Sequence, residues 1–141
     1  MQDPAFFRSA GVEKGRDGCR VPLPWTTGGA SLGFGGDHPH LPQPAWFSGR
    51  SVQAQDDDPA STLRLYRRVL GLRRKLQSGE SLQWVDSADT VLHFRRPGGW
   101  ESITNFDSEP VQLSAPAVIS SSPLADKTVL PTDTTAWIMP S

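Results

Sequence analysis

The chain has 141 residues, 36% of them hydrophobic, and a formal net charge of −1 at pH 7. It is long enough for one ordinary domain, but a complete (β/α)₈ barrel typically needs about 250 residues. The near-zero charge provides no global field that favours nucleic acid, acidic polymers or a membrane surface. The only cysteine is Cys19, which excludes a disulfide within the chain and a cysteine-based zinc cluster.

Residues 1–57 show little periodicity and are repeatedly interrupted by proline and glycine. Trp25, Phe34, Trp46 and Phe47 are scattered through them, whereas disordered linkers are poor in aromatic residues. We therefore expect an ordered, irregular segment that packs on other protein. No signal peptide and no membrane span can be read from the sequence. Together with the single cysteine this favours a cytoplasmic protein.

The clearest helix is expected to begin near Asp58. Asp58 is a good N-cap and Pro59 suits the first helical position. Apolar residues then recur at helical spacing from Leu63 to Leu76, with arginine and lysine between them. Gly79 follows, where a C′ glycine or a turn is expected. The apolar stripe is wide for a freestanding helix, so we expect it to dock on a large core.

From Leu82 onward the hydrophobic period changes to two, which predicts a small antiparallel β-sheet or sandwich. The expected strands are Leu82–Val85, Val91–Arg96, Trp100–Phe106, Val111–Leu113, Val118–Ser120 and Thr134–Met139. Pro97-Gly98-Gly99 between two of them is a good hairpin loop. The fold class is therefore α+β, and a sheet of about 60 residues needs the helix, or more, for support.

The most specific feature is the run from Gly15 to Trp25, which reads Gly-Arg-Asp-Gly-Cys-Arg-Val-Pro-Leu-Pro-Trp. It resembles the Arg-Asp-x-x-Arg-x-Pro-x-x-Trp segment of α-glucosidases in glycoside hydrolase family 13, of the oligo-1,6-glucosidase or actinobacterial type. The run Leu65–Arg74 resembles the last barrel helix of that family. Further runs resembling its C-terminal β domain are Asn105-Phe106, Pro110–Leu113 and Thr135–Ile138.

The resemblance covers essentially the whole chain and implies its organisation. Residues 1–77 would be the tail of a catalytic (β/α)₈ barrel, namely the loop after its eighth strand and its eighth helix. Residues 78–141 would be the C-terminal antiparallel β domain. The implied partners are an oligosaccharide substrate and the N-terminal barrel that this chain lacks. No cofactor, nucleic acid or membrane partner is implied.

Catalysis in this family is retaining double displacement, with two carboxyl groups about 5–5.5 Å apart. The nucleophile, the acid/base and a third aspartate that stabilises the transition state lie on earlier barrel strands. The resemblance begins after those strands. We therefore expect no catalytic residue in this chain and no activity from the chain alone.

One substrate-binding residue carries over from the resemblance. Arg20, the second arginine of the motif, matches the arginine that helps to bind the non-reducing terminal glucose in the −1 subsite. In the family it works with an aspartate from an early barrel loop. A guanidinium offers fixed donors to sugar hydroxyls and to a carboxylate at once. Arg16 and Asp17 also match motif positions, and we expect them to brace the loop.

Other residues that could carry chemistry have simpler interpretations. Cys19 is expected to be a small buried thiol without a catalytic partner. His38 and His40 flank a proline and fit no metal-ligand spacing, which favours a solvated loop. The run Asp56–Asp58 lacks the alternation and glycine turn of a calcium loop, so helix capping explains it better. No metal site is predicted.

Two further features of the sequence suit other functions. The arginine-rich helix would suit nucleic acid, but its interleaved apolar stripe and the near-zero net charge argue against that. Trp and Phe residues of the β part could form a sugar-stacking face, although such residues more often fill the core of a small sheet. The alternative to an enzyme part is therefore a non-catalytic carbohydrate-binding or structural β module.

Overall fold

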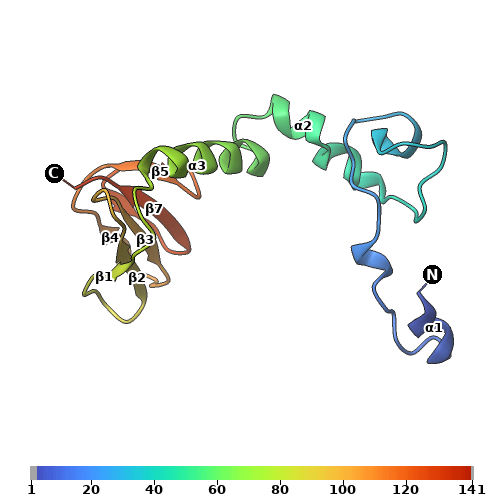
Figure 1. Ribbon diagram of the computed structural model, residues 1–141, viewed down its shortest axis with the longest axis horizontal. Helices are drawn as coiled ribbons and strands as arrows, with labels where there is room; N and C mark the ends of the chain where they lie inside the picture. Colours follow the sequence, from blue (N-terminus) through green and yellow to red (C-terminus); the bar gives the residue numbers. More distant parts are fainter. Residues whose placement is uncertain (1–2, 141) are drawn as a thin grey trace. The chain divides into compact units, whose positions relative to one another are not determined.

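The computed structural model describes residues 3–140, traced in chain order in Figure 1. The chain divides into two compact units, of which the first ends at Tyr66 and the second begins at Arg67. The division falls inside helix α3 (Thr62–Leu76). The predicted boundary after residue 77, between a barrel tail and a β domain, stays a prediction.

The first unit consists of short helices and turns. Its elements are α1 (Pro4–Arg8), 3-10 turns at Asp17–Cys19, Ala30–Gly33 and Ala45–Arg50, α2 (Val52–Asp57) and the start of α3. The sequence pattern does not predict α2, because six residues are too few for apolar periodicity to show. Its N-cap is the fully buried Ser51, whose Oγ accepts a hydrogen bond from the N–H of Ala54 at 3.2 Å.

Helix α3 begins later than the sequence predicts. Asp58 is the C-cap of α2, and its Oδ1 accepts from the N–H of Ala60 at 2.9 Å. The side chain that caps α3 is Ser61, whose Oγ accepts from the N–H of Arg64 at 3.2 Å. The prediction of Asp58 as N-cap is wrong because the aspartate bonds its own local turn, which delays the helix by one turn.

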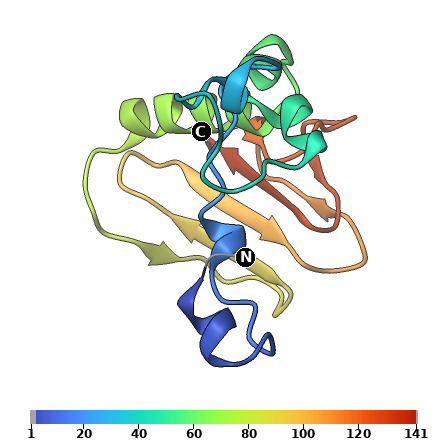
Figure 2. The same ribbon diagram turned by 90° about the vertical axis from the view of Figure 1, so that its right-hand side faces the viewer.

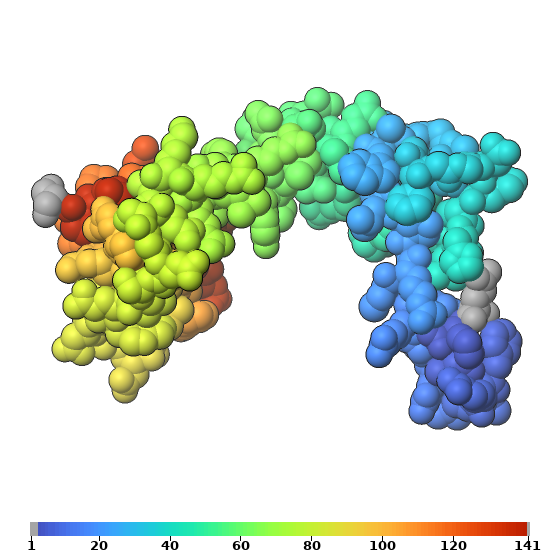
Figure 3. All heavy atoms as spheres, in the orientation of Figure 1, coloured from blue at the N-terminus to red at the C-terminus, as the bar shows by residue number. Residues whose placement is uncertain are grey.

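Helix α3 carries an exposed apolar stripe. None of its residues is buried, and the side chains of Tyr66 and Leu70 are 62% and 49% exposed. The atoms of this helix are drawn in green and lime green in Figure 3. Docking of this helix on a larger core stays a prediction, and the open stripe is the surface that such docking would cover.

The second unit is dominated by antiparallel sheet (Figure 2). Its strands are β1 (Gln83–Trp84), β2 (Val91–Arg95), β3 (Glu101–Asn105), β4 (Val111–Gln112), β5 (Ala117–Ser120), β6 (Val129–Leu130) and β7 (Thr134–Ile138). Five strands form one sheet in the order β1-β2-β3-β7-β5, while β4 pairs with β6. All of these pairings are antiparallel. The predicted α+β class, with a helix followed by a small antiparallel sheet, is confirmed.

The β2–β3 hairpin has the predicted loop. Gly98 and Gly99 both have positive φ, +92° and +82°, which favours glycine. The N–H of Arg96 donates to the carbonyl of Trp100 at 2.9 Å and closes the loop. Strand β6 is not among the predicted strands, because Val129 and Leu130 show no alternation and are followed directly by a proline.

The hydrophobic core of this unit draws residues from both sheets. Its buried members are Ile103, Leu113, Ala117, Leu130, Ala136 and Ile138. Strand β7 alternates between buried and half-buried residues, as a strand with one face on a core should. Trp100 is 4% exposed and packs on Trp137 with ring centroids 4.6 Å apart. Aromatic residues therefore fill part of this core, as the sequence suggests.

Candidate substrate-binding loop

The predicted binding loop is attached to helix α1 through Asp3. Asp3 is the N-cap of α1, and its Oδ1 accepts from the N–H of Ala5 at 2.8 Å. Pro4 occupies the first turn, where its missing N–H costs nothing. The Asp-Pro pair thus determines the helix start locally.

The second carboxylate oxygen of Asp3 holds the motif. Its Oδ2 accepts from the backbone N–H of Arg16 at 2.8 Å and from Nη1 of Arg20 at 3.0 Å. The N–H of Asp3 donates to Oδ2 of Asp17 at 3.2 Å. Arg16, Asp17 and Arg20, the three residues predicted from the sequence, therefore all form hydrogen bonds with Asp3. Sequence reasoning missed Asp3, although the Asp-Pro capping pattern is a readable signal.

A tight turn allows one carboxylate to reach both arginines. Within the 3-10 turn Asp17–Cys19, the N–H of Cys19 donates to the carbonyl of Arg16 at 2.9 Å, and that of Arg20 to Asp17 at 3.0 Å. Gly15 has a φ of +64°, and a Cβ there would lie 2.4 Å from Cγ of Asp3. Only glycine allows the backbone to approach the aspartate this closely.

Hydrogen bonding keeps the Asp3 carboxylate ionised. The N–H groups of Arg16 and Ala5 lower the pKa of Asp3 and, with the charge of Arg20, outweigh the opposing effect of burial. The side chain of Asp3 is 8% exposed and that of Arg20 is 49% exposed. Nη1 of Arg20 is thus bound to a nearly buried anion, while about half of the side chain remains exposed. Such an arginine can donate further hydrogen bonds to hydroxyls or to a second carboxylate.

The last residues of the motif are tied to the start of α2. The N–H of Val52 donates to the carbonyl of Pro24 at 3.1 Å, and the N–H of Gln53 donates to that of Trp25 at 3.0 Å. The side chain of Trp25 remains 49% exposed. Both ends of the motif are therefore fixed by backbone contacts, one through Asp3 and the other through α2.

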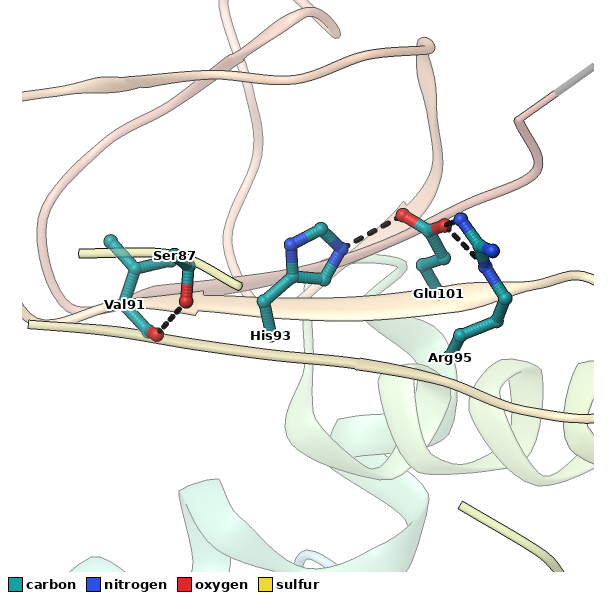
Figure 4. A network of polar contacts seen from close by, with 5 residues as sticks. All are labelled: Ser87, Val91, His93, Arg95 and Glu101. Atoms are coloured by element: carbon teal, nitrogen blue, oxygen red, sulfur yellow. Dashed lines mark hydrogen bonds and ion pairs between the residues drawn. The ribbon is translucent and has the colours of Figure 1, made fainter. Parts of the chain in front are cut away.

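A second ion cluster lies in the β unit, around Glu101 (Figure 4). Its Oε2 lies 2.8 Å from Nε2 of His93, and its Oε1 accepts from Nε and Nη2 of Arg95 at 2.8 and 2.5 Å. Burial raises the pKa of Glu101, but the hydrogen bonds from Arg95 and His93 lower it more, so it lies below its ordinary value. Both oxygens are occupied, and Arg95 lies directly opposite Glu101 in the register. This cluster joins β2 to β3.

Comparisons with known proteins find similarity to one type of carbohydrate-processing enzyme. No family model matches the chain. A protein named probable alpha-glucosidase, from Rhizobium meliloti (strain 1021), is 38% identical over 109 residues, which cover 73% of this chain and 19% of the relative. The chain resembles the C-terminal portion of a glycoside hydrolase family 13 α-glucosidase.

Solved structures agree with this family 13 resemblance. The α-glucosyl transfer enzyme XgtA matches with a TM-score of 0.69 and 30% identity, over 97% of this chain and 28% of that protein. Isomaltulose synthase from Klebsiella sp. LX3 has a TM-score of 0.66 at 18% identity, over 94% and 29%, and shows the fold alone. The chain spans about a fifth of the length of the curated relative and less than a third of these structures.

In the described part of the chain, the other candidate residues gather into no further site. Cys19 is exposed, so the prediction of a buried thiol is wrong: it ends the 3-10 turn Asp17–Cys19, in which no residue is buried. His38 and His40 are exposed. In residues 3–140, no three or more His, Cys, Asp or Glu side chains are grouped to hold a metal ion. No helix in the described part of the chain is long and apolar enough to span a membrane.

Proposed function

We propose that the chain is the C-terminal portion of a cytoplasmic retaining α-glucosidase that removes terminal α-linked glucose from oligosaccharides. Arg20 binds the terminal glucose in that enzyme, and Arg16 and Asp17 brace the loop. The observation that carries the proposal is the half-exposed side chain of Arg20, whose Nη1 is held by a nearly buried carboxylate. The name of the Rhizobium relative supports the same activity.

The chemistry of Arg20 suits recognition of a chain end. A planar guanidinium carries five N–H donors in a fixed arrangement, and Asp3 accepts from Nη1. The other donors can bind the hydroxyls of a terminal sugar and an acidic partner from the missing barrel. That arrangement closes the pocket behind the terminal glucose and leads to exo-cleavage. The catalytic carboxyl groups belong to the part of the enzyme that this chain lacks.

A chimera tests the role of Arg20. This chain is fused after the part of the Rhizobium relative that precedes its matching region, and kcat/KM is measured on a chromogenic α-glucoside. We expect Arg20→Ala to lower kcat/KM by about 10- to 100-fold, because hydrogen bonds from a charged donor are lost. Arg50→Ala, at an exposed arginine of the same unit, is the matched control. An active chimera in which both substitutions behave alike would contradict the proposal.

The chain alone provides a complementary test. It should not turn over the chromogenic α-glucoside at any concentration, because it lacks the expected nucleophile and acid/base. Turnover that survives rigorous purification, and scales with the concentration of the chain, would show that catalytic residues lie within it.

A second candidate function is a non-catalytic carbohydrate-binding module, favoured by the exposed Trp84. Its side chain is 64% exposed, and its ring meets Phe94 edge-on, with centroids 6.0 Å apart. Exposed aromatic rings of this kind can stack on sugars. Millimolar binding of maltose or isomaltose to the chain in calorimetry, abolished by Trp84→Ala, would support the module. Trp46→Ala is the control, because Trp46 is 66% exposed and also has an aromatic edge partner, Phe47.

A further inference from the structure

We propose that Asp3 is the positioning residue for Arg20: by holding Nη1 of its guanidinium, it fixes the direction in which the remaining donors point. This inference rests on the proposed role of Arg20 and adds a residue that the motif itself does not contain. Asp3 does not touch substrate in this assignment and acts only through the arginine.

Asp3 is nearly buried, whereas Arg20 is half exposed and can reach a ligand. The side chain of Asp3 is 8% exposed, and that of Arg20 is 49% exposed. An exposed arginine ordinarily samples many rotamers, which must be restricted when a ligand binds. An arginine already held by a buried anion loses less conformational freedom on binding. The anchor therefore preorganises the arginine before the sugar arrives.

The remaining contacts of Asp3 explain why it is a rigid anchor. Oδ1 is engaged by the N–H of Ala5 at 2.8 Å, and Oδ2 by the N–H of Arg16 at 2.8 Å. The N–H of Asp3 is itself bound to Asp17 at 3.2 Å. Gly15 lies so close that a Cβ would sit 2.6 Å from Cβ of Asp3. With both oxygens bonded and one side blocked, the carboxylate has one orientation.

The bonding pattern also leaves Arg20 free to act. Among the described residues, Asp3 is the hydrogen-bond and ion-pair partner of its guanidinium, through Nη1. A single-nitrogen contact restrains the side chain without occupying a whole edge of the fork. The guanidinium can therefore present Nε and Nη2 to a ligand.

NMR of the complete 141-residue chain, labelled with ¹⁵N-arginine, tests the proposal without requiring activity. The heteronuclear NOE of each Nε–Hε group reports how restricted that side chain is on the fast timescale. In the wild type we expect a higher value for Arg20 than for the exposed Arg8 and Arg50. Asp3→Asn keeps an oxygen to cap α1 but removes the charge, and should lower the Arg20 value to theirs. Asp37→Asn, at an exposed aspartate, should leave it unchanged.

Acid titration of the wild type gives a second measurement that needs no substitution. Because hydrogen bonding lowers the pKa of Asp3, Arg20 should stay restricted as the pH falls through the ordinary aspartate range and be released only below it. The proposal is overturned if Arg20 remains restricted in Asp3→Asn, or if acid releases it without the titration of Asp3. These readouts concern the chain alone. An active chimera indifferent to Arg20→Ala would contradict the proposed function and leave the NMR result as it stands.

Discussion

Asp3 in the first unit and Glu101 in the second each bind an arginine, but with different numbers of hydrogen bonds. Each is a nearly buried carboxylate whose partner is a half-exposed arginine: the side chains are 8% and 49% exposed in one pair, and 3% and 48% in the other. Glu101 binds two nitrogens of Arg95 and also His93, whereas Asp3 binds one nitrogen of Arg20 and two backbone N–H groups. The two pairs therefore differ in the number of bonds between carboxylate and guanidinium and not in exposure.

The largest expected effect is on stability, at the pair that joins two strands. Arg95→Ala should lower the free energy of unfolding of the β unit by about 2 kcal/mol, because a buried carboxylate loses charge-assisted hydrogen bonds. Near-UV circular dichroism of the Trp100–Trp137 pair during urea denaturation would measure it. Lys127→Ala, at an exposed lysine, is the control. Equal stability in both variants would show that Glu101 is satisfied without Arg95.

Acid should affect the same pair in a defined direction. Folding lowers the pKa of Glu101 from an ordinary 4.5, so the folded state binds fewer protons there. Its stabilising contribution is complete above that value and declines as the pH falls through the lower folded value. In the Arg95→Ala variant, only His93 opposes the effect of burial on the pKa of Glu101, so this pKa should be higher than in the wild type. The stabilising contribution of Glu101 should therefore begin to decline at a higher pH. Near-UV circular dichroism during acid titration of both proteins would compare the onsets, and identical onsets would contradict the assigned cause.

The exposed stripe of α3 should be detectable with a hydrophobic dye. The open Tyr66 and Leu70 predict dye fluorescence or self-association of the chain. Leu70→Gln should reduce that signal with little change in stability, because the side chain is half exposed. Val118→Gln, also 50% exposed but on β5, is the matched control. A monodisperse wild-type monomer that melts cooperatively and binds no dye would contradict the expectation.

The smallest expected effect is at the other arginine. Arg20→Ala should shift the thermal midpoint of the chain far less than Arg95→Ala, because Asp3 loses one hydrogen bond and keeps those from the N–H groups of Ala5 and Arg16. Differential scanning calorimetry of both variants would test this. A shift as large as that of Arg95→Ala would indicate that Arg20 is a structural residue, and the two pairs would then be alike.

Local sequence signals predict the secondary-structure elements more reliably than they predict the contacts between residues. The Pro97-Gly98-Gly99 loop was predicted from turn chemistry, and it sets the register that places Arg95 opposite Glu101. That pair was therefore readable, because counting outward from a known loop gives every cross-strand neighbour. The start of α3 was misplaced because both Asp58 and Ser61 are good caps, and only their competing hydrogen bonds decide between them.

For the proposed binding loop, the sequence reveals the motif but not the contacts that its residues make. Arg16, Asp17 and Arg20 were found by resemblance, and nothing in their spacing indicates a carboxylate thirteen or more residues upstream. The contact depends on the path of residues 9–15, which carry no periodic pattern. In the proposed function the chain supplies one side of the substrate pocket, so the residues of the other side cannot be read from its sequence.

Because Gly15 lies so close to Asp3, the residues at these two positions should depend on each other in related sequences. With a Cβ of residue 15 at 2.4 Å from Cγ of Asp3, the two positions cannot vary independently. Relatives that keep an aspartate at the first position should keep glycine at the second, and relatives that lose one should have changed the other. Covariation of two sites twelve residues apart would therefore record, in sequences alone, whether evolution has preserved this anchor.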